Sequence, residues 1–228
     1  MNDVFARVIN LSSRPDRWAR IKSLGIPRFD ALSGNTDALS LHALCKFKKP
    51  RARHEDIVGL GAIGCALSHI QVWREFLESD KSHCLVLEDD IQLVDVSKHI
   101  VYGADIHLLG WCGQLHPRWG NVHNDRVVPW PASCGFVGAH AYLITRHAAT
   151  QLLKTALPLE MQVDYYIQSV AWRDGLVITK GHNKIRQVYT GSDVFTLCFM
   201  CEPVYPIAFG VALTVLVFAL WKLRPLTK

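Results

Sequence analysis

The sequence predicts an α/β domain with a mostly parallel sheet, and three observations support this fold class. Short apolar runs typical of buried strands alternate with longer segments whose apolar residues recur at helical spacing. One such run, Cys84–Leu87, stops directly at three acids, Glu88, Asp89 and Asp90, as a strand does where it enters a functional loop. The length of 228 residues is enough for one domain with a complete core.

The chain begins with a predicted strand, helix and second strand. Residues 4–11 form the first apolar run, and we expect Ser12 or Ser13 to cap a helix over 15–24 that has Pro15 at its start. Residues 28–32 predict a short strand. The basic segment 36–53 has little periodicity and is interpreted as a surface loop or weak helix, either a solvated face or a contact for an acceptor or a phosphate.

A glycine-rich segment opens the longest predicted helix, which runs to about Ser79. Gly59, Gly61 and Gly64 precede apolar residues spaced three to four apart. No strong strand directly precedes these glycines, so they do not form a dinucleotide-binding fingerprint. We interpret them as allowing the start of the helix to approach a backbone or a phosphate closely.

Predicted strands and helices also alternate in the second half of the chain. Residues 114–130, between the strands predicted over 105–111 and 136–144, form an aromatic, proline-rich loop whose length suggests a function. Asp174 and Gly175 mark a turn before the last strand. The predicted elements are strands over 84–90, 105–111, 136–144 and 176–178, and helices over 146–156 and 163–172.

The three consecutive acids predict a metal site. Adjacent carboxylates at a strand end repel one another, and a hard divalent cation with oxygen ligands compensates their charge. Ligands of open α/β sheets bind outside the carboxyl ends of strands, where these acids lie. The pattern predicts Mn²⁺ or Mg²⁺ with a phosphate-bearing substrate, and the alternative is an ordinary solvated loop.

The charge distribution argues against a nucleic-acid-binding protein, and the cysteines form no complete zinc-binding pattern. The net charge is +5, of which the last seven residues supply three charges, so the remainder has no basic stripe suited to nucleic acid. Cys65 and Cys84 lie inside apolar patterns, as reduced core residues do. Cys198 and Cys201 form a CxxC without a second pair, which fits palmitoylation at least as well as zinc.

Residues 204–221 predict a C-terminal transmembrane helix. They carry no charge, and as a helix they extend roughly 27 Å, about the thickness of a bilayer core. A basic tail, 222–228, follows at once; the alternative is a buried core helix. No signal peptide precedes the predicted domain, 1–200. We therefore favour a single-pass anchor with a cytosolic domain, although the positive-inside rule favours the opposite topology.

Four patches occur in the order shared by one known family. Gly61–His69 reads G-x-x-G-C-x-x-S-H, and Gly138–Tyr142 reads G-x-x-A-Y. Weaker similarities lie at Val163-Asp164 and Ser192-Asp193. With these features the chain resembles glycosyltransferase family 25, which includes lipooligosaccharide and collagen galactosyltransferases, over about residues 5–194. The four patches are Val8–Leu11 with Arg14 and Arg17, Gly61–His69 with Trp73, Leu87–Asp90, and Gly138–Ile144.

The resemblance implies a GT-A fold, a single Rossmann-type domain that binds a nucleotide-sugar. It also implies metal-dependent, inverting transfer of a hexose, in the first place galactose, from a UDP-sugar to a hydroxyl of a glycan, lipooligosaccharide or glycoprotein. Asp89 and Asp90 are expected at the metal, and His140 contacts the metal or a phosphate, or packs in its strand. Asp164 is the expected base, with Asp193 in reserve.

The expected donor contacts are Asn10, Arg14, Arg17, Ser68, His69 and Glu88. Arg14 and Arg17 would bind the diphosphate bidentately, or form an exposed helix start. Glu88 would hold the loop or touch the ribose. Two other functions remain open: a non-catalytic membrane-bound scaffold of the same fold, and a metal-dependent nucleotidyltransferase, which would need a glycine-rich phosphate loop with a nearby lysine.

Overall fold

The computed structural model describes residues 3–34, 59–92, 94–112, 126–127, 136–181 and 185–188. The chain divides into two compact units, Met1–Phe195 and Thr196–Lys228, each with contacts mainly within itself. Every described residue lies in the first unit. Among the described residues, no helix is long and apolar enough to cross a membrane. The predicted basic loop 36–53, the predicted transmembrane helix 204–221 and Asp193 lie outside the described residues.

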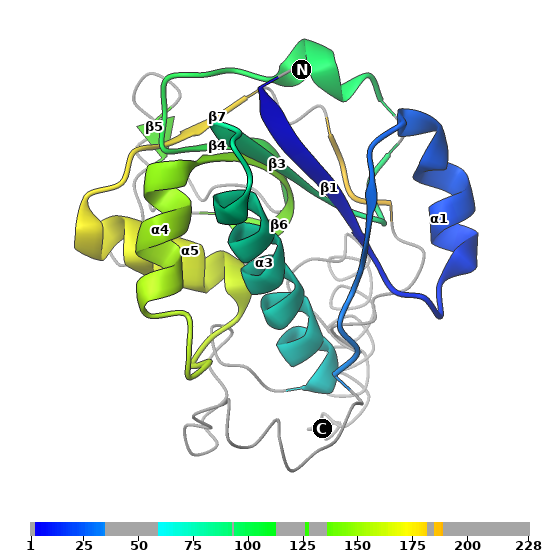
Figure 1. Ribbon diagram of the computed structural model, residues 1–228, viewed down its shortest axis with the longest axis horizontal. Helices are drawn as coiled ribbons and strands as arrows, with labels where there is room; N and C mark the ends of the chain where they lie inside the picture. Colours follow the sequence, from blue (N-terminus) through cyan, green and yellow to red (C-terminus); the bar gives the residue numbers. More distant parts are fainter. Residues whose placement is uncertain are drawn as a thin grey trace, which may run out of the picture. The chain divides into compact units, whose positions relative to one another are not determined.

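A mixed sheet forms the centre of the domain (Figure 1). Its seven strands lie in the order β2-β1-β3-β6-β4-β7-β5. β1, β2, β3, β4 and β7 run in one direction, whereas β6 is antiparallel to both of its neighbours and β5 is antiparallel to β7. The predicted class is therefore confirmed, with an antiparallel strand in the middle of the sheet. The strands are β1 Val4–Asn10, β2 Arg28–Asp30, β3 His83–Glu88, β4 Ile106–Cys112, β5 Arg126–Val127, β6 Val137–Thr145 and β7 Ile178–Lys180.

The helices lie close to their predicted positions. One detail was wrong: the residue before the first helix is Arg14, without a side-chain cap, and neither Ser12 nor Ser13 caps it. Pro15 does occupy the first turn, where its missing N–H costs no hydrogen bond. The helical segments are α1 Pro15–Ile21, the 3₁₀ turns η1 Lys22–Leu24 and η2 Val96–His99, α3 Leu60–Glu78, α4 Arg146–Lys154 and α5 Val163–Asp174.

The two faces of the sheet bury separate hydrophobic clusters. One contains residues of α3, α4 and α5 with the β3 side chains Cys84 and Val86, and its centre is the fully buried Trp73. The other contains Ile21 of α1 with Leu85 and Leu87 of the same strand. Successive side chains of β3 thus face α3 and α1 in turn, as the two-residue period of a strand requires. Figure 1 shows α3, α4 and α5 together in front of the sheet and α1 apart from them.

Both ends of α3 are held in place. The predicted use of glycine is confirmed at Gly64, where a Cβ would lie 2.4 Å from the Leu32 carbonyl oxygen, so the helix can approach the chain after β2 only without a side chain. At the other end, the Arg146 guanidinium donates to the carbonyls of Phe76, Leu77 and Ser79, in the last turn of the helix and just after it. The side chains of α3 are therefore presented to β3 from a rigid element.

Candidate functional site

Polar side chains meet at one edge of the sheet, where β1 and β3 end and β6 begins. Ile9 is in register with Glu88, so Asn10 and Asp89 follow side by side. Leu87 is in register with Ala141, which puts His140 beside Glu88. We call Asn10, Glu88, Asp89, Asp90 and His140 the acidic edge. It lies at the carboxyl ends of parallel strands, as predicted for a ligand site.

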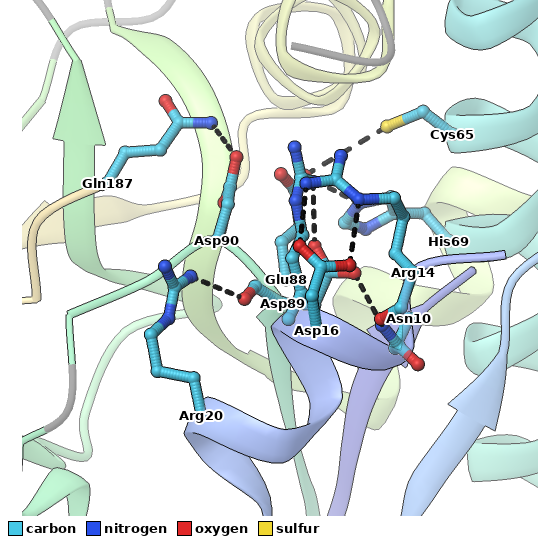
Figure 2. A network of polar contacts seen from close by, with 11 residues as sticks. Asn10, Arg14, Asp16, Arg20, Cys65, His69, Glu88, Asp89, Asp90 and Gln187 are labelled. Atoms are coloured by element: carbon cyan, nitrogen blue, oxygen red, sulfur yellow. Dashed lines mark hydrogen bonds and ion pairs between the residues drawn. The ribbon is translucent and has the colours of Figure 1, made fainter. Parts of the chain in front are cut away.

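The strand period separates the three consecutive acids (Figure 2). Glu88 contacts His69 of α3, Asp89 contacts Arg17 of α1, and Asp90 contacts Gln187 of the segment 185–188. Each carboxylate therefore has its own partner on a different element. Of these partners only Arg17 carries a fixed positive charge, so the protein compensates the charge of Asp89 and forms hydrogen bonds with Glu88 and Asp90.

Asp89 is engaged on both of its carboxylate oxygens. Arg17 Nη1 lies 3.0 Å from Oδ1 and Asn10 Nδ2 lies 2.6 Å from Oδ2, and the two charged side chains are only 6% and 8% exposed. Arg20 Nη2 donates to the Asp89 carbonyl at 3.1 Å. This buried ion pair ties the end of β3 to α1. The charge of Arg17 is paired with Asp89, and its predicted contact with the diphosphate stays a prediction.

Asp90 presents an unsatisfied oxygen. Its Oδ2 accepts from Gln187 Nε2 at 2.6 Å, while its buried Oδ1 has no hydrogen-bond partner among the described residues. Burial, together with the nearby charge of Glu88, raises the pKa of Asp90 to about 7. A buried carboxylate in this state is poised to take up either a proton or a cation.

His140 has one ring nitrogen engaged and one available. Its Nε2 lies 3.1 Å from the Ile185 carbonyl, which can only accept, so Nε2 carries the proton. Burial lowers the pKa of His140, so the ring is neutral and Nδ1 keeps a lone pair. Nδ1 is buried and has no hydrogen-bond partner within the described part of the chain. A carbonyl on the opposite nitrogen is the usual arrangement of a metal-ligating histidine.

The unsatisfied atoms of the acidic edge suit a cation. Asn10 Oδ1, Asp90 Oδ1 and His140 Nδ1 are all buried acceptors without a partner among the described residues, and each is a type of atom that a divalent ion accepts as a ligand. The predicted set of Asp89, Asp90 and His140 does not come together as one ligand group, however. In the described ranges, the three side chains whose ligand atoms lie within 4.8 Å of one another are Cys65, His69 and Glu88.

Two predicted donor contacts are fully buried and engaged inside the protein. Ser68 Oγ donates to the Gly64 carbonyl at 2.7 Å and accepts from the Leu32 N–H at 2.9 Å. His69 uses Nδ1 with the Tyr142 hydroxyl and Nε2 with Glu88. Both side chains are therefore held by partners inside the protein, and their predicted contact with the donor stays a prediction. Sequence alone does not reveal this because both belong to an apparent glycine-led binding helix.

Glu88 and Arg14 are the other two residues that the sequence predicts to contact the donor. Burial alone would raise the pKa of Glu88, but the hydrogen bond and charge of His69, with the charges of His140 and Arg17, outweigh it and hold the pKa below its usual value. The Glu88 side chain is 21% exposed. Arg14 pairs with the exposed Asp16 at 3.1 Å and lies in the turn after β1. Their donor-binding roles stay predictions.

Asp164 clamps the start of β6. Its Oδ2 accepts from the Gly138 N–H and its Oδ1 from the Tyr165 N–H, both at 2.9 Å. Burial raises the pKa of Asp164, which the backbone hydrogen bonds oppose and the charge of Glu88 reinforces. Gln168, one turn further along α5, holds both the N–H and the carbonyl of Phe136. The geometry thus gives Asp164 a structural role beside the predicted role of base.

Comparison with known proteins shows that the part of the chain carrying Asn10, Glu88, Asp89 and Asp90 is similar to a known family. Residues 4–107 match the family model described as glycosyltransferase family 25 (LPS biosynthesis protein). The matched segment includes α3 and all three consecutive acids, whereas His140 and Asp164 lie beyond it.

Three curated relatives show the extent of the similarity. A Haemophilus influenzae protein named as a glycosyltransferase is 33% identical over 128 residues, 51% of this chain and 43% of that protein. Human procollagen galactosyltransferase 2 is 31% identical over 97 residues, 37% of this chain and 15% of the relative. The mouse inactive glycosyltransferase 25 family member 3 is 30% identical over 100 residues, 39% and 17% of the two chains. The chain therefore spans less than half the length of each relative.

Proposed function

We propose that the protein is a member of glycosyltransferase family 25, whose family model matches residues 4–107, and that it is a metal-dependent, inverting hexosyltransferase with a GT-A-like, nucleotide-sugar-binding domain. The donor is a UDP-sugar, in the first place UDP-galactose, and the acceptor is a hydroxyl of a glycan, lipooligosaccharide or glycoprotein. The observation that carries the proposal is the set of buried, unsatisfied acceptor atoms at the acidic edge, of which those of Asn10 and Asp90 lie within the segment that matches the family model.

A divalent cation, Mn²⁺ or Mg²⁺, would be held by Asp90 Oδ1, with His140 Nδ1 and Asn10 Oδ1 as the further acceptors that the protein leaves unpaired. When bound, such an ion neutralises the charge that develops on a leaving diphosphate. Asp89 supports this site from the side, because its pairing with Arg17 and Asn10 holds the end of β3 in place.

Of the remaining site residues, two would bind the donor and one would take up the proton of the acceptor. Arg14, in the turn after β1, would neutralise diphosphate charge. Glu88 offers a carboxylate oxygen to hydroxyl groups of the donor. Asp164 would take the proton of the acceptor hydroxyl, since burial raises its pKa and so makes its carboxylate a stronger base.

Turnover of a UDP-sugar tests the proposal directly. We expect the purified protein to release UDP from UDP-[¹⁴C]galactose or UDP-[¹⁴C]glucose in the presence of MnCl₂, and EDTA to lower the rate at least about 100-fold because the diphosphate charge is then uncompensated. Calorimetric titration of MnCl₂ into the metal-free protein gives a readout independent of activity. Full turnover in EDTA would refute the metal dependence.

A non-catalytic scaffold of the same fold is the second candidate. It is favoured by the structural engagement of Asp164 and by the mouse relative that is named inactive. A protein that binds UDP-galactose with Mn²⁺ but releases no UDP in the same assay, with a range of glycan acceptors, would support the scaffold.

Membrane attachment through residues 204–221 is also proposed, because this stretch carries no charge and is followed by a basic tail. We expect the full chain to float with liposomes in a density gradient and a chain ending at Cys201 to remain in the soluble fraction. Flotation of both chains would locate the attachment elsewhere. Protease protection on sealed membranes distinguishes a cytosolic domain from the opposite topology.

A further inference from the structure

A buried chain of hydrogen bonds connects the core of the domain to the acidic edge. Trp73 Nε1 donates to the Tyr142 hydroxyl at 2.9 Å, the hydroxyl lies 2.8 Å from His69 Nδ1, and His69 Nε2 lies 3.2 Å from Glu88 Oε1. Trp73, Tyr142 and His69 are completely buried, whereas Glu88 is partly exposed. This series of hydrogen bonds therefore starts in the hydrophobic cluster beneath α3 and ends at the acidic edge.

The donors and acceptors of this chain can be assigned from chemistry. An indole N–H only donates, so the Tyr142 oxygen accepts from Trp73 and its own proton points to His69 Nδ1. With Nδ1 accepting, the neutral ring carries its proton on Nε2 and donates it to Glu88. If the ring becomes an imidazolium, the Tyr142 oxygen accepts from Nδ1 as well, and Nε2 still donates. His69 is thus a donor to Glu88 in either state.

These donor and acceptor assignments determine which carboxylate oxygen of Glu88 is engaged by the protein. Its Oε1 is held by His69 Nε2 and by the Cys65 thiol at 3.9 Å, two side chains one turn apart on the rigid helix α3. No hydrogen bond to Oε2 is formed among the described residues, and the side chain is 21% exposed. One carboxylate oxygen is therefore anchored while the other is left for a ligand.

We propose that His69 is a positioning residue that directs Glu88 Oε2 to accept a hydroxyl group of the nucleotide-sugar donor. This inference rests on the proposed function and deepens it. A carboxylate oxygen accepts strongly from O–H groups, and a nucleotide-sugar offers them on both the ribose and the hexose. Trp73 and Tyr142 set the orientation of the imidazole, so residues far from the ligand determine the geometry of its contact.

Metal ligation by Cys65, His69 and Glu88 is the competing use of the same atoms. A metal on His69 Nε2 would move the ring proton to Nδ1, and the Tyr142 oxygen would then accept from both Trp73 and His69. The Tyr142 proton would lose its acceptor in a completely buried position, a costly arrangement. The hydrogen-bonded chain uses every donor once, which favours positioning over metal ligation.

Two substitutions of His69 separate positioning from packing. The amide nitrogen of Gln can take the place of Nε2, whereas that of Asn reaches only the place of Nδ1, so His69→Gln keeps the donor to Glu88 and His69→Asn removes it. We expect calorimetry with MnCl₂ to show UDP-galactose binding to His69→Gln within about three-fold of the unaltered protein. Binding to His69→Asn should be at least about ten-fold weaker, the loss expected for a hydrogen bond to a charged group.

UDP alone identifies the hydroxyl that Glu88 recognises. Equal losses for UDP and UDP-galactose in His69→Asn place the contact on the ribose, and a loss confined to UDP-galactose places it on the hexose. In a Glu88→Ala background, His69→Asn should have no further effect if it acts through Glu88. Equal weakening by both His69 substitutions, or an undiminished effect of His69→Asn without Glu88, would overturn the proposal.

A measurement without ligand keeps the inference distinct from the proposed function. ¹⁵N NMR of the unliganded protein should show His69 with a proton on Nε2, its signals being assigned by their loss in His69→Gln. A neutral ring protonated on Nδ1 would refute the chain of hydrogen bonds. If the unaltered protein shows this tautomer but binds neither UDP nor UDP-galactose, the hydrogen-bond network stands while the proposed function and the donor contact built on it both fail.

Discussion

Asp90→Asn is expected to lower sugar transfer below about a tenth of the rate of the unaltered protein and, in metal-free buffer, to raise thermal stability at pH 8. The loss of activity follows because Asp90 Oδ1 is the buried, unpaired carboxylate oxygen proposed to hold the cation, and an amide is a far weaker ligand. The substitution preserves the size of the side chain and an acceptor for Gln187. Activity and melting temperature therefore move in opposite directions.

The gain in stability of Asp90→Asn is expected to increase with pH. The pKa of Asp90 is raised in the folded protein from an ordinary 3.8 to about 7, so the folded state holds this proton more tightly than the unfolded chain does. Ionisation between pH 3.8 and about 7 consequently favours unfolding, and the stability contributed by the protonated acid is lost as the pH rises through about 7. Asp90→Asn avoids that loss, so its advantage in melting temperature should be full at pH 8 and vanish as the pH falls toward 4.

Asp89→Asn is the matched control, because it alters the neighbouring acid by the same chemical change. It breaks a buried ion pair and leaves Arg17 uncompensated, which is expected to cost about 3–5 kcal/mol of unfolding free energy at pH 7. Denaturant titration of the two variants measures the contrast. Retention of more than about a tenth of the activity by Asp90→Asn, or a loss of stability at pH 8, would remove Asp90 from the metal site.

Asp164→Asn is expected to reduce the turnover rate at least about 100-fold while the affinity for UDP-galactose stays near that of the unaltered protein. The reason is that an amide cannot take the proton of the acceptor hydroxyl, whereas the donor does not need this group. Some stability is also lost, because both Asp164 oxygens accept backbone N–H groups and an amide offers only one acceptor. The loss of one such bond costs about 1–3 kcal/mol.

Gln168→Leu supplies the control for that structural effect. It removes the hydrogen bonds that Gln168 forms with Phe136, so it loosens the same start of β6 and leaves the Asp164 carboxylate in place. We expect this variant to be destabilised to a similar degree yet to keep most of its turnover rate. Equal losses of turnover in both variants would make Asp164 a clamp, and the search for the base would move to Asp193 and Asp125.

Most elements of the fold could be predicted because their patterns are local. The apolar run before Glu88 specifies β3, and the three-to-four spacing after Gly59 specifies α3, whose end at Glu78 lies within a residue or two of the predicted one. The antiparallel direction of β6 was missed, since an apolar run carries no sign of the direction in which its strand enters the sheet.

The roles of Ser68, His69 and Arg17 could not be predicted for a different reason. Their motif marks them as part of a site, but whether a side chain reaches a ligand or supports another residue depends on its burial and its partners. The partner of Arg17 lies 72 positions further along the chain, and that of Asp90 lies 97 positions away. Gln187 belongs to no motif, so no local signal could have identified it.

The sequence by itself determined that a strand would end in three carboxylates at the ligand-binding edge of an α/β sheet. Only the tertiary structure decided that these acids have three different environments. Because β3 presents alternate residues to its two faces and is covered by α3 on one and α1 on the other, Glu88 meets His69 and Asp89 meets Arg17. Asp90 lies past the end of the strand, where the chain is free to turn, and only there is a carboxylate oxygen left buried and unpaired among the described residues.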